Sequence, residues 1–391
     1  MPASDTAAAT NPTGSNQTGS NPPASSGEPI PLFDPRGQYL RLQAEIDARV
    51  AAVMAHGAYI NGPEVAELEQ ALCRATGAEA CVACANGTDA LVMSLLAHGI
   101  GPGDAVFVPA FTYVATAGAV RLVGATPVFC DVLDATANLD PDDLARQVAR
   151  ISASGALRPR AVLPVDLYGL PADYARVHDV AQAHDLLVIA DAAQSMGGAR
   201  DGVPVGALAN VTCVSFFPTK PLGCAGDGGA ILTQDAGLAE RLRVLRTHGT
   251  DASRTAIELG MNNRLDTLQA AILLAKLPHL TAERQHRERL AARYDARLAE
   301  VTQTAPRDAG CDSAWALYTL RSEQRDTVRQ ALADQRIAAA VYYHAPVHLH
   351  PAYKAFGDGP GSLPVSERLA GRVLSLPLTS EMTEAQADRV A

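Results

Sequence analysis

The 391-residue chain has no long hydrophobic run, only one tryptophan, and fewer basic than acidic residues. No apolar segment reaches the roughly 20 residues that a membrane-spanning helix requires, and none near the N-terminus has the form of a secretory signal peptide. Lysine and arginine number 32 against 42 aspartates and glutamates, so the net charge is −10. This charge argues against nucleic-acid binding. We expect a cytoplasmic protein with neither a membrane nor a nucleic acid as partner.

The seven cysteines are too scattered to predict a disulfide or zinc framework. Their odd number is typical of reduced, mostly buried cysteines in a cytoplasmic protein. Cys81 and Cys84 form a C-x-x-C pair inside a predicted strand, but no second pair completes a zinc site. We therefore expect both to be core residues and expect no metal site.

Large apolar side chains are almost absent from residues 1–29. Such a segment cannot bury enough surface to offset the entropy lost on ordering, so it is predicted to be a disordered tail. The rest of the chain is long enough for two domains. We expect a large domain over 30–278 and a smaller C-terminal domain over 279–391.

Short apolar runs alternate with helical patterns from residue 80 onward. Continuous apolar strands separated by helices are typical of a parallel sheet covered on both faces. Helices are also predicted over 38–56, from about 63, and over 266–276 and 282–301. The predicted strands are 80–85, 105–108, 127–131, 161–165, 186–190, 211–217 and 230–233, and the helices between them are 89–98, 114–122, 141–150, 172–184 and 236–246.

A lysine stands just past the end of the predicted strand 211–217, in the sequence SFFPTKPLGCAGDGG. Lys220 lies between Pro218 and Pro221, and because proline lacks the backbone donor that helices and strands need, the lysine belongs to a loop. In open α/β sheets, ligands bind at the carboxyl ends of the strands. An amine at this position predicts Schiff-base chemistry; a solvated loop lysine is the alternative.

Two groups near strand ends could bind an anion. Gly87 and Thr88, in the segment Asn86-Gly87-Thr88-Asp89, join a strand to a helix whose free amides can bind a phosphate. The alternative is an ordinary helix start capped by Thr88 or Asp89. Ser215, five residues before Lys220, could offer its hydroxyl to the same phosphate.

Tyr113 and Asp191 also follow predicted strands, and each suits one part of a flat, protonated ring. An aromatic side chain at a strand end can stack on such a ring, although core packing also explains this tyrosine. Asp191 leaves a buried apolar run, where its carboxylate needs a cationic or donor partner such as a protonated pyridine nitrogen. The small alanines after it would let a ring lie over the backbone; a helix N-cap aspartate is the alternative.

One cofactor, pyridoxal 5′-phosphate, accounts for these four strand ends together. It requires a lysine for the Schiff base, a carboxylate at the pyridine nitrogen, a phosphate cup at a helix start and a group stacked on the ring. A dinucleotide cofactor is poorly supported, because the glycines over 223–229 have the wrong spacing for G-x-G-x-x-G and open no helix. The four sites in this order therefore predict a pyridoxal-phosphate enzyme.

From about residue 30 onward the chain resembles the DegT/DnrJ-type nucleotide-sugar aminotransferases, a branch of the aspartate-aminotransferase fold. The resemblance implies an α/β protein of pyridoxal-phosphate fold type I, with a mostly parallel seven-stranded sheet between helices and a smaller α+β C-terminal domain. It rests on the motifs GPEVAELE (62–69), ANGTDAL (85–91), FTYVATA (111–117), PVDLYGLPAD (164–173), DAAQ (191–194), SFFPTKPLGCAGDGGA (215–230) and GMNNRLDTLQAAIL (260–273).

The resemblance also implies roles for single residues. Lys220 would carry the cofactor and move the proton, Asp191 would pair with the pyridine nitrogen, and Gln194 would bond the phenolic oxygen. A lysine rather than a histidine at position 220 separates the aminotransferases from related dehydratases. The other implied cofactor contacts are Tyr113 and Ala193 on the two faces of the ring, Gly87, Thr88 and Ser215 at the phosphate, and Asn262 reaching the phosphate from the other subunit of a homodimer.

The implied reaction moves an amino group from L-glutamate to a keto sugar nucleotide, with pyridoxamine 5′-phosphate as the intermediate form of the cofactor. The motif over 215–230 most resembles the branch that acts on UDP-2-acetamido-2-deoxy-3-keto-glucuronic acid in surface polysaccharide biosynthesis. Arg264 matches an arginine expected to meet the substrate carboxylate, which suits a guanidinium; pairing with Asp266 is the alternative. Tyr342, Tyr343 and His344 lie in a segment that lines the sugar pocket, although that branch often has histidine at position 342.

Two other functions remain compatible with these features. An aminotransferase for a dTDP-linked 3- or 4-keto deoxysugar would have an uncharged pocket near Arg264. A non-catalytic regulator would bind the cofactor but would not respond to glutamate.

Overall fold

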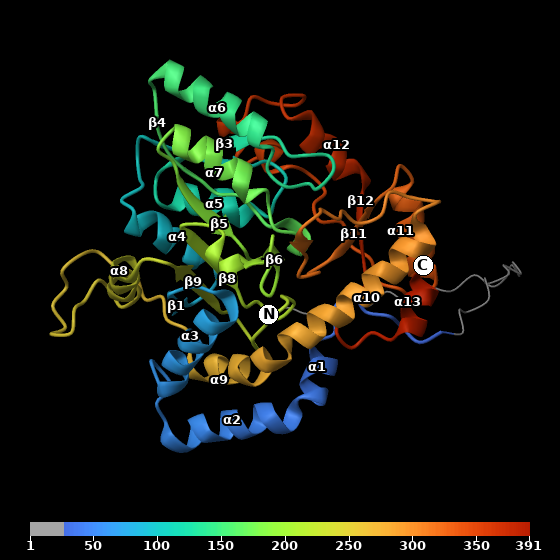
Figure 1. The fold of residues 1–391 in the computed structure, drawn as a ribbon, viewed down its shortest axis with the longest axis horizontal. Coiled ribbons are helices and arrows are strands. Elements are labelled where there is room, and N and C mark those ends of the chain that lie inside the picture. The colour runs from blue at the N-terminus through green and yellow to red at the C-terminus, as the bar shows by residue number, and fades with distance from the viewer. Residues whose placement is uncertain (1–26) are drawn as a thin grey trace, which may run out of the picture.

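The computed structural model describes residues 27–391, so the tail predicted over 1–29 lies almost entirely outside the described residues. A seven-stranded sheet with the order β1-β9-β8-β5-β4-β2-β3 forms the centre of the molecule (Figure 1). The pairings from β8 to β3 are parallel, and β9 runs antiparallel to both of its neighbours. The strands are β1 Ala80–Cys84, β2 Asp104–Pro109, β3 Thr126–Cys130, β4 Arg158–Val162, β5 Leu187–Asp191, β8 Val211–Ser215 and β9 Gly229–Thr233.

Each predicted strand is present, with small shifts at its ends. The largest shift is in β4, which begins at Arg158 rather than at 161. The backbone of Arg158 pairs with Asp104 of the neighbouring β2, and its guanidinium lies 2.7 Å from the buried Asp104 carboxylate. The strand predicted over 211–217 ends at Ser215, where the chain turns toward Lys220.

Helices cover both faces of the sheet because side chains along each strand alternate between two apolar cores. In β8, Val211 and Cys213 face one core and Val214 faces the other. The first core is covered by α4 Gly87–Ala97, α5 Val114–Leu122 and α8 Ala236–Arg246. The opposite face is covered by α3 Pro63–Thr76, α6 Pro141–Ser154, α7 Tyr174–Ala183 and α9 Thr267–Lys276.

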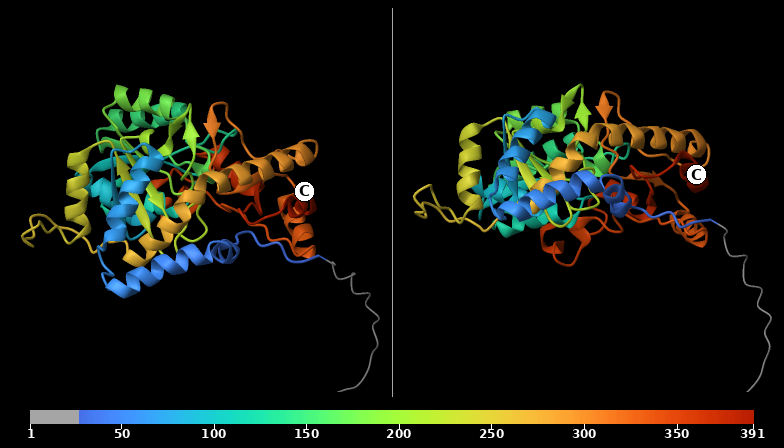
Figure 2. Two further views of the ribbon diagram at one scale, coloured as in Figure 1. Left: turned by 60° about the horizontal axis from the view of Figure 1, so that its bottom comes forward. Right: turned by 90° about the horizontal axis from the view of Figure 1, so that it is seen from below.

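The single helix predicted over 38–56 is wrong: the structure has α1 Pro35–Arg41 and α2 Gln43–His56. Asp34 caps α1 by accepting a hydrogen bond from the Gly37 N–H at 2.8 Å. The helix is interrupted at Leu42, whose side chain is buried against α9, whereas Arg41 pairs with Glu381. The two helices therefore follow different surfaces, and α2 lies along α9 at the edge of the molecule (Figure 2).

After α9 the long helix α10, Leu280–Leu298, leads into a separate apolar core in the C-terminal part of the chain. This core surrounds a two-stranded antiparallel sheet of β11 Tyr318–Arg321 and β12 Val373–Leu376. It includes Ile30, whose backbone pairs with Ile337, so the first described residues pack with the C-terminal part and not on the main sheet. The other elements there are α11 Arg325–Asp334, α12 Pro364–Arg372 and α13 Glu384–Val390, and a small sheet joins β10 Cys311–Asp312 to β6 Ala199–Arg200 and β7 Val203–Pro204.

Cys81 and Cys84 are both buried, as expected for core residues. They lie on opposite faces of β1, in different apolar cores, so they cannot bind one metal ion together. Between residues 27 and 391, no helix has the length and apolarity needed to cross a membrane.

Candidate active site

A cavity of about 420 Å³ opens where β1, β2, β5 and β8 end. These four strands point the same way. The pairings from β2 to β8 are parallel, and β1 has the direction of β8 because both run antiparallel to β9. Their carboxyl ends therefore meet at one edge of the sheet, which brings together Gly87 and Lys220, 133 positions apart. The cavity is lined by Gly87, Thr88, Tyr113, Asp191, Ala193, Gln194, Ser215, Lys220, Tyr342 and Tyr343 among the residues predicted from the sequence.

Asp191 and Lys220 face the same cavity, and burial shifts the pKa of both. Asp191 ends β5, and burial raises the pKa of its carboxyl, against a 2.8 Å hydrogen bond from the Thr116 hydroxyl and the charge of Lys220. Burial lowers the pKa of Lys220, and the charge of Asp191 opposes this shift. A lowered pKa leaves more of the amine uncharged near neutral pH, and the uncharged form is the one that attacks a carbonyl.

The start of α4 and the end of β8 form a narrow anion cup. Asn86 caps α4, accepting from the Asp89 N–H at 2.9 Å, so the alternative interpretation, a cap at Thr88 or Asp89, is wrong. A Cβ on Gly87 would lie 2.7 Å from the Cβ of Ser215, so only glycine allows this approach. Ser215 accepts from the Phe217 N–H at 3.3 Å, which leaves its hydroxyl hydrogen free for a ligand. The unpaired amides of the first helical turn complete a cup that suits a phosphate.

Aromatic and amide groups line the rest of the cavity. Tyr113 is 57% exposed, so it is not the packed core residue that the alternative interpretation required. Its ring lies 6.0 Å from that of Tyr343, between centroids. The Gln194 side chain accepts from the Tyr168 N–H at 2.7 Å and donates to the Tyr343 hydroxyl at 3.4 Å. A flat ring between Tyr113 and Ala193 would therefore meet a positioned amide at its edge.

Three predicted residues lie outside the lining of this cavity. Asn262 and His344 are exposed, and Arg264 is partly buried. Between residues 27 and 391, no ion pair joins Arg264 to Asp266, so the structural alternative for this arginine has no support. Asn262 follows a segment that projects away from the body after α8 (Figures 1 and 2). This position is compatible with a contact in another subunit, and the roles of all three stay predictions.

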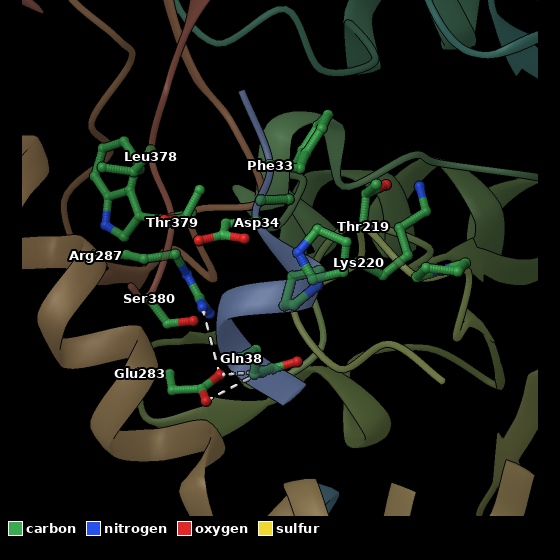
Figure 3. A pocket seen from close by; sticks show the side chains of 15 residues that line it. Phe33, Asp34, Gln38, Thr219, Lys220, Glu283, Arg287, Leu378, Thr379 and Ser380 are labelled. Atoms are coloured by element: carbon green, nitrogen blue, oxygen red, sulfur yellow. Dashed lines mark hydrogen bonds and ion pairs between the residues drawn. The ribbon is translucent and has the colours of Figure 1, made fainter. Parts of the chain in front are cut away.

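A smaller hollow of about 50 Å³ lies beside the Lys220 loop (Figure 3). Phe33 lines this hollow and also the larger cavity. In the smaller hollow the Glu283 carboxylate accepts from Gln38 of α1 at 3.1 Å and lies 3.9 Å from the Arg287 guanidinium. Burial lowers the pKa of Arg287 to about 10, and the charge of Glu283 opposes this. The ion pair lies within α10, and the hydrogen bond from Gln38 ties α1 to this helix. Neither interaction involves the Lys220 amine.

Several residues in or beside the cavity had no predicted role. Thr116 does not line the cavity but bonds Asp191, which does; it could have been found, because it lies in the FTYVATA segment one helical turn after Thr112. Phe33 and Leu317 could not, because they come from segments distant in sequence that only the tertiary fold brings to the cavity. Asp227 gave no signal beyond its place in a glycine-rich loop.

The geometry fits pyridoxal phosphate. A lysine amine of lowered pKa, a buried carboxylate, a glycine-dependent anion cup and a stacking tyrosine surround one cavity. These groups match the aldehyde, the pyridine nitrogen, the phosphate and the ring face of the cofactor. The fold and the site therefore define a pyridoxal-phosphate-dependent enzyme of the aspartate-aminotransferase-like class.

The chain belongs to the DegT/DnrJ/EryC1/StrS aminotransferase family, whose model matches residues 41–391. It is 44% identical over 350 residues to the UDP-2-acetamido-2-deoxy-3-oxo-D-glucuronate aminotransferase of Pseudomonas aeruginosa, covering 89% of this chain and 95% of that protein. It is 40% identical over 366 residues to the dTDP-3-amino-3,4,6-trideoxy-alpha-D-glucose transaminase of Streptomyces venezuelae, covering 92% and 94%.

A crystal structure of a family member from Brucella abortus superposes with a TM-score of 0.90 at 46% identity, covering 92% of this chain and 97% of the other. Other similar structures hold the cofactor as pyridoxal or pyridoxamine phosphate. The predicted fold class and cofactor are confirmed, and the protein is a pyridoxal-phosphate-dependent nucleotide-sugar aminotransferase.

Proposed function

We propose that the enzyme transfers the amino group of L-glutamate to UDP-2-acetamido-2-deoxy-3-keto-glucuronic acid. The observation that supports this substrate is Arg264, a partly buried guanidinium with no carboxylate partner among residues 27–391, in a chain 44% identical to an aminotransferase named for that sugar. A guanidinium of this kind suits the carboxylate of a uronic acid. The product would serve surface polysaccharide biosynthesis in the cytoplasm.

Each half of the reaction would use the same protein groups. Bound pyridoxal phosphate supplies a carbonyl that takes the amino group and a ring that stabilises the carbon losing its proton. Lys220 moves that proton, because burial lowers the pKa of its amine and the side chain enters the cavity from a fixed turn. Asp191 holds the charge of the ring nitrogen, Gln194 bonds the phenolic oxygen, and Gly87, Thr88 and Ser215 bind the phosphate.

The acceptor side would be completed by a second subunit. In this proposal the enzyme is a homodimer in which Asn262 and Arg264 of one subunit reach the cavity of the other. The position of both residues outside their own subunit's cavity supports this arrangement. Tyr342 and Tyr343 would border the sugar within the same subunit, and His344 would meet it only from the rim.

The main rival is an aminotransferase for a dTDP-linked 3- or 4-keto deoxysugar. The 40% identity to a dTDP-sugar transaminase favours it, as does tyrosine rather than histidine at position 342. A regulator that binds the cofactor without turnover is the other alternative.

An absorbance trace of the holoenzyme tests these functions in sequence. We expect L-glutamate to bleach the visible band of the bound cofactor, and UDP-2-acetamido-2-deoxy-3-keto-glucuronic acid to restore it. If the band returns only with a dTDP-linked keto sugar, the proposed acceptor is wrong. If glutamate has no effect, the proposed donor is wrong and the regulator gains support.

Lys220→Ala provides the matched control for this trace. The variant should lose turnover by several orders of magnitude, because no other described amine lines the cavity. Circular dichroism and the melting temperature should stay close to wild type, since the lysine side chain supports no packing in the core. An active Lys220→Ala enzyme would contradict the assignment.

A further inference from the structure

Tyr168 lies next to the cavity without lining it, in the short turn Leu167–Gly169. It belongs to the PVDLYGLPAD segment, to which no role was assigned from the sequence. The residue is buried, and its φ of 62° lies in the left-handed region that a tyrosine rarely adopts. Such a conformation persists only where surrounding contacts fix it, which directs attention to those contacts.

Two hydrogen bonds connect Tyr168 to the segment that borders the acceptor side. Its hydroxyl donates to the backbone carbonyl of Tyr342. Its N–H donates to the Gln194 side chain at 2.7 Å, and the same side chain donates to the Tyr343 hydroxyl at 3.4 Å. Tyr342 and Tyr343, which we call the acceptor wall, are therefore both tied to Tyr168, one directly and one through Gln194.

The turn that carries Tyr168 is itself fixed on two sides. A Cβ on Gly169 would lie 2.9 Å from the backbone nitrogens of Trp315 and Ala316, so the turn packs directly on the segment that supplies Ala316 and Leu317 to the cavity. On the other side, the N–H of Asp166 donates to the carbonyl of Asp191 at 3.1 Å. The end of β5 therefore helps to fix the position of the Tyr168 hydroxyl.

The Tyr168 hydroxyl is well suited to donate. Burial raises the pKa of Tyr168, so the hydroxyl keeps its proton at any pH the enzyme meets. The carbonyl of Tyr342 can only accept. Removing the hydroxyl would leave this partly buried carbonyl without that donor and would free the acceptor wall from the turn.

We propose that Tyr168 is a positioning residue that holds the acceptor wall against Gln194, so that the wall is in place when the keto sugar binds. This inference rests on the proposed function, because it concerns the acceptor half of that reaction. The donor half depends on Lys220, Asp191 and Gln194, and the Tyr168 hydroxyl touches none of them, because only the backbone N–H of Tyr168 bonds Gln194. We therefore expect a variant of Tyr168 to be defective only in the half-reaction with the keto sugar.

Tyr168→Phe tests the proposal, because it removes one hydroxyl and keeps the ring. Tyr294→Phe is the matched control: Tyr294 is also buried and also donates to a backbone carbonyl, that of Pro377 at 2.8 Å, in the C-terminal core. For Tyr168→Phe we expect the KM of the keto sugar to rise roughly five- to tenfold. This is the effect expected from the loss of one ordinary hydrogen bond. The rate of bleaching by glutamate should change less than about twofold, and Tyr294→Phe should change neither quantity.

Hydrogen exchange of the holoenzyme provides a readout that needs no sugar. Amides over 341–345 should exchange faster in Tyr168→Phe than in wild type. In Tyr294→Phe the exchange rates of the same amides should equal those of wild type. If glutamate or the UDP sugar proves inactive with wild type, the proposed function fails, whereas the exchange comparison still decides the role of Tyr168. Equal exchange over 341–345 in Tyr168→Phe and Tyr294→Phe would overturn the inference, as would an equal loss in both half-reactions.

Discussion

A buried carboxylate such as Asp191 stays charged only if donors replace the water that it has lost. The Thr116 hydroxyl is one of these donors, at 2.8 Å, and the Ala193 N–H is the other, at 3.3 Å. Thr116→Val removes the hydroxyl with little change in shape. Because a hydrogen bond to a charged group contributes about 1.5–3 kcal/mol, we expect pyridoxal phosphate to bind roughly ten- to a hundredfold more weakly.

Titration of the apoenzyme with cofactor, followed by absorbance, measures this effect. Thr319→Val is the control, since Thr319 shares a buried hydrogen bond with Ser375 at 2.8 Å in the C-terminal sheet. The two variants should lose similar stability, but only Thr116→Val should lose cofactor affinity. Equal cofactor affinities in Thr116→Val and Thr319→Val would show that Thr116 does not support Asp191.

A second buried carboxylate, Asp166, predicts a pH-dependent stability. Burial raises the pKa of Asp166 to about 6, although Ser195, Ala172 and Tyr174 donate hydrogen bonds to it. The pKa in the unfolded chain is about 3.9, so the folded protein binds the proton more tightly. This contribution to stability is complete below the unfolded pKa and is lost as the pH rises through about 6.

Melting temperatures of wild type and Asp166→Asn measure this contribution between pH 4 and 7. Asparagine cannot ionise, so the difference between the two proteins should shift in favour of the variant as the pH rises. A shift in pKa of about two units corresponds to roughly 3 kcal/mol at most. A difference that does not vary with pH would contradict the prediction.

Among the elements, the junction of α4 with β8 depends on one glycine. An alanine at position 87 would place its Cβ 2.7 Å from that of Ser215, and such overpacking costs about 1–3 kcal/mol. We expect Gly87→Ala to lower the melting temperature and to weaken cofactor binding through the distorted phosphate cup. Gly371→Ala in α12 is the control, because its Cβ meets nothing within 4 Å and alanine favours a helix. Comparable losses in both variants would refute a specific role of the junction.

The sheet and the cofactor side of the site could be predicted because their signals are local. Apolar runs mark the strands, and Asp191, Gly87 and Lys220 each lie at the end of one or within five residues after it. The break at Leu42 could not be predicted, since the apolar spacing continues through it and burial against α9 decides the course of the chain. Phe33 and Leu317 likewise reach the cavity only through tertiary packing between segments distant in sequence.

At the scale of the whole molecule, the segment after α8 supports the proposed homodimer. It projects from the body (Figure 2) and carries Leu259, which is 96% exposed, and Ile257, which is 60% exposed. Apolar side chains on a projecting segment are typical of a surface that another chain covers. Asn262 and Arg264 follow this segment directly, so a partner bound there would lie close to both residues.

Mixing two inactive variants tests whether the active sites are shared. Lys220→Ala removes the amine of a subunit's own site, and Arg264→Ala removes the guanidinium that we place in the partner's site. A mixed dimer would then have one site with both defects and one intact site. If subunits exchange at random, half of the dimers are mixed and activity should recover to about a quarter of the wild-type value. If Arg264 acted within its own subunit, both sites of every mixed dimer would carry one defect, and mixing would restore nothing.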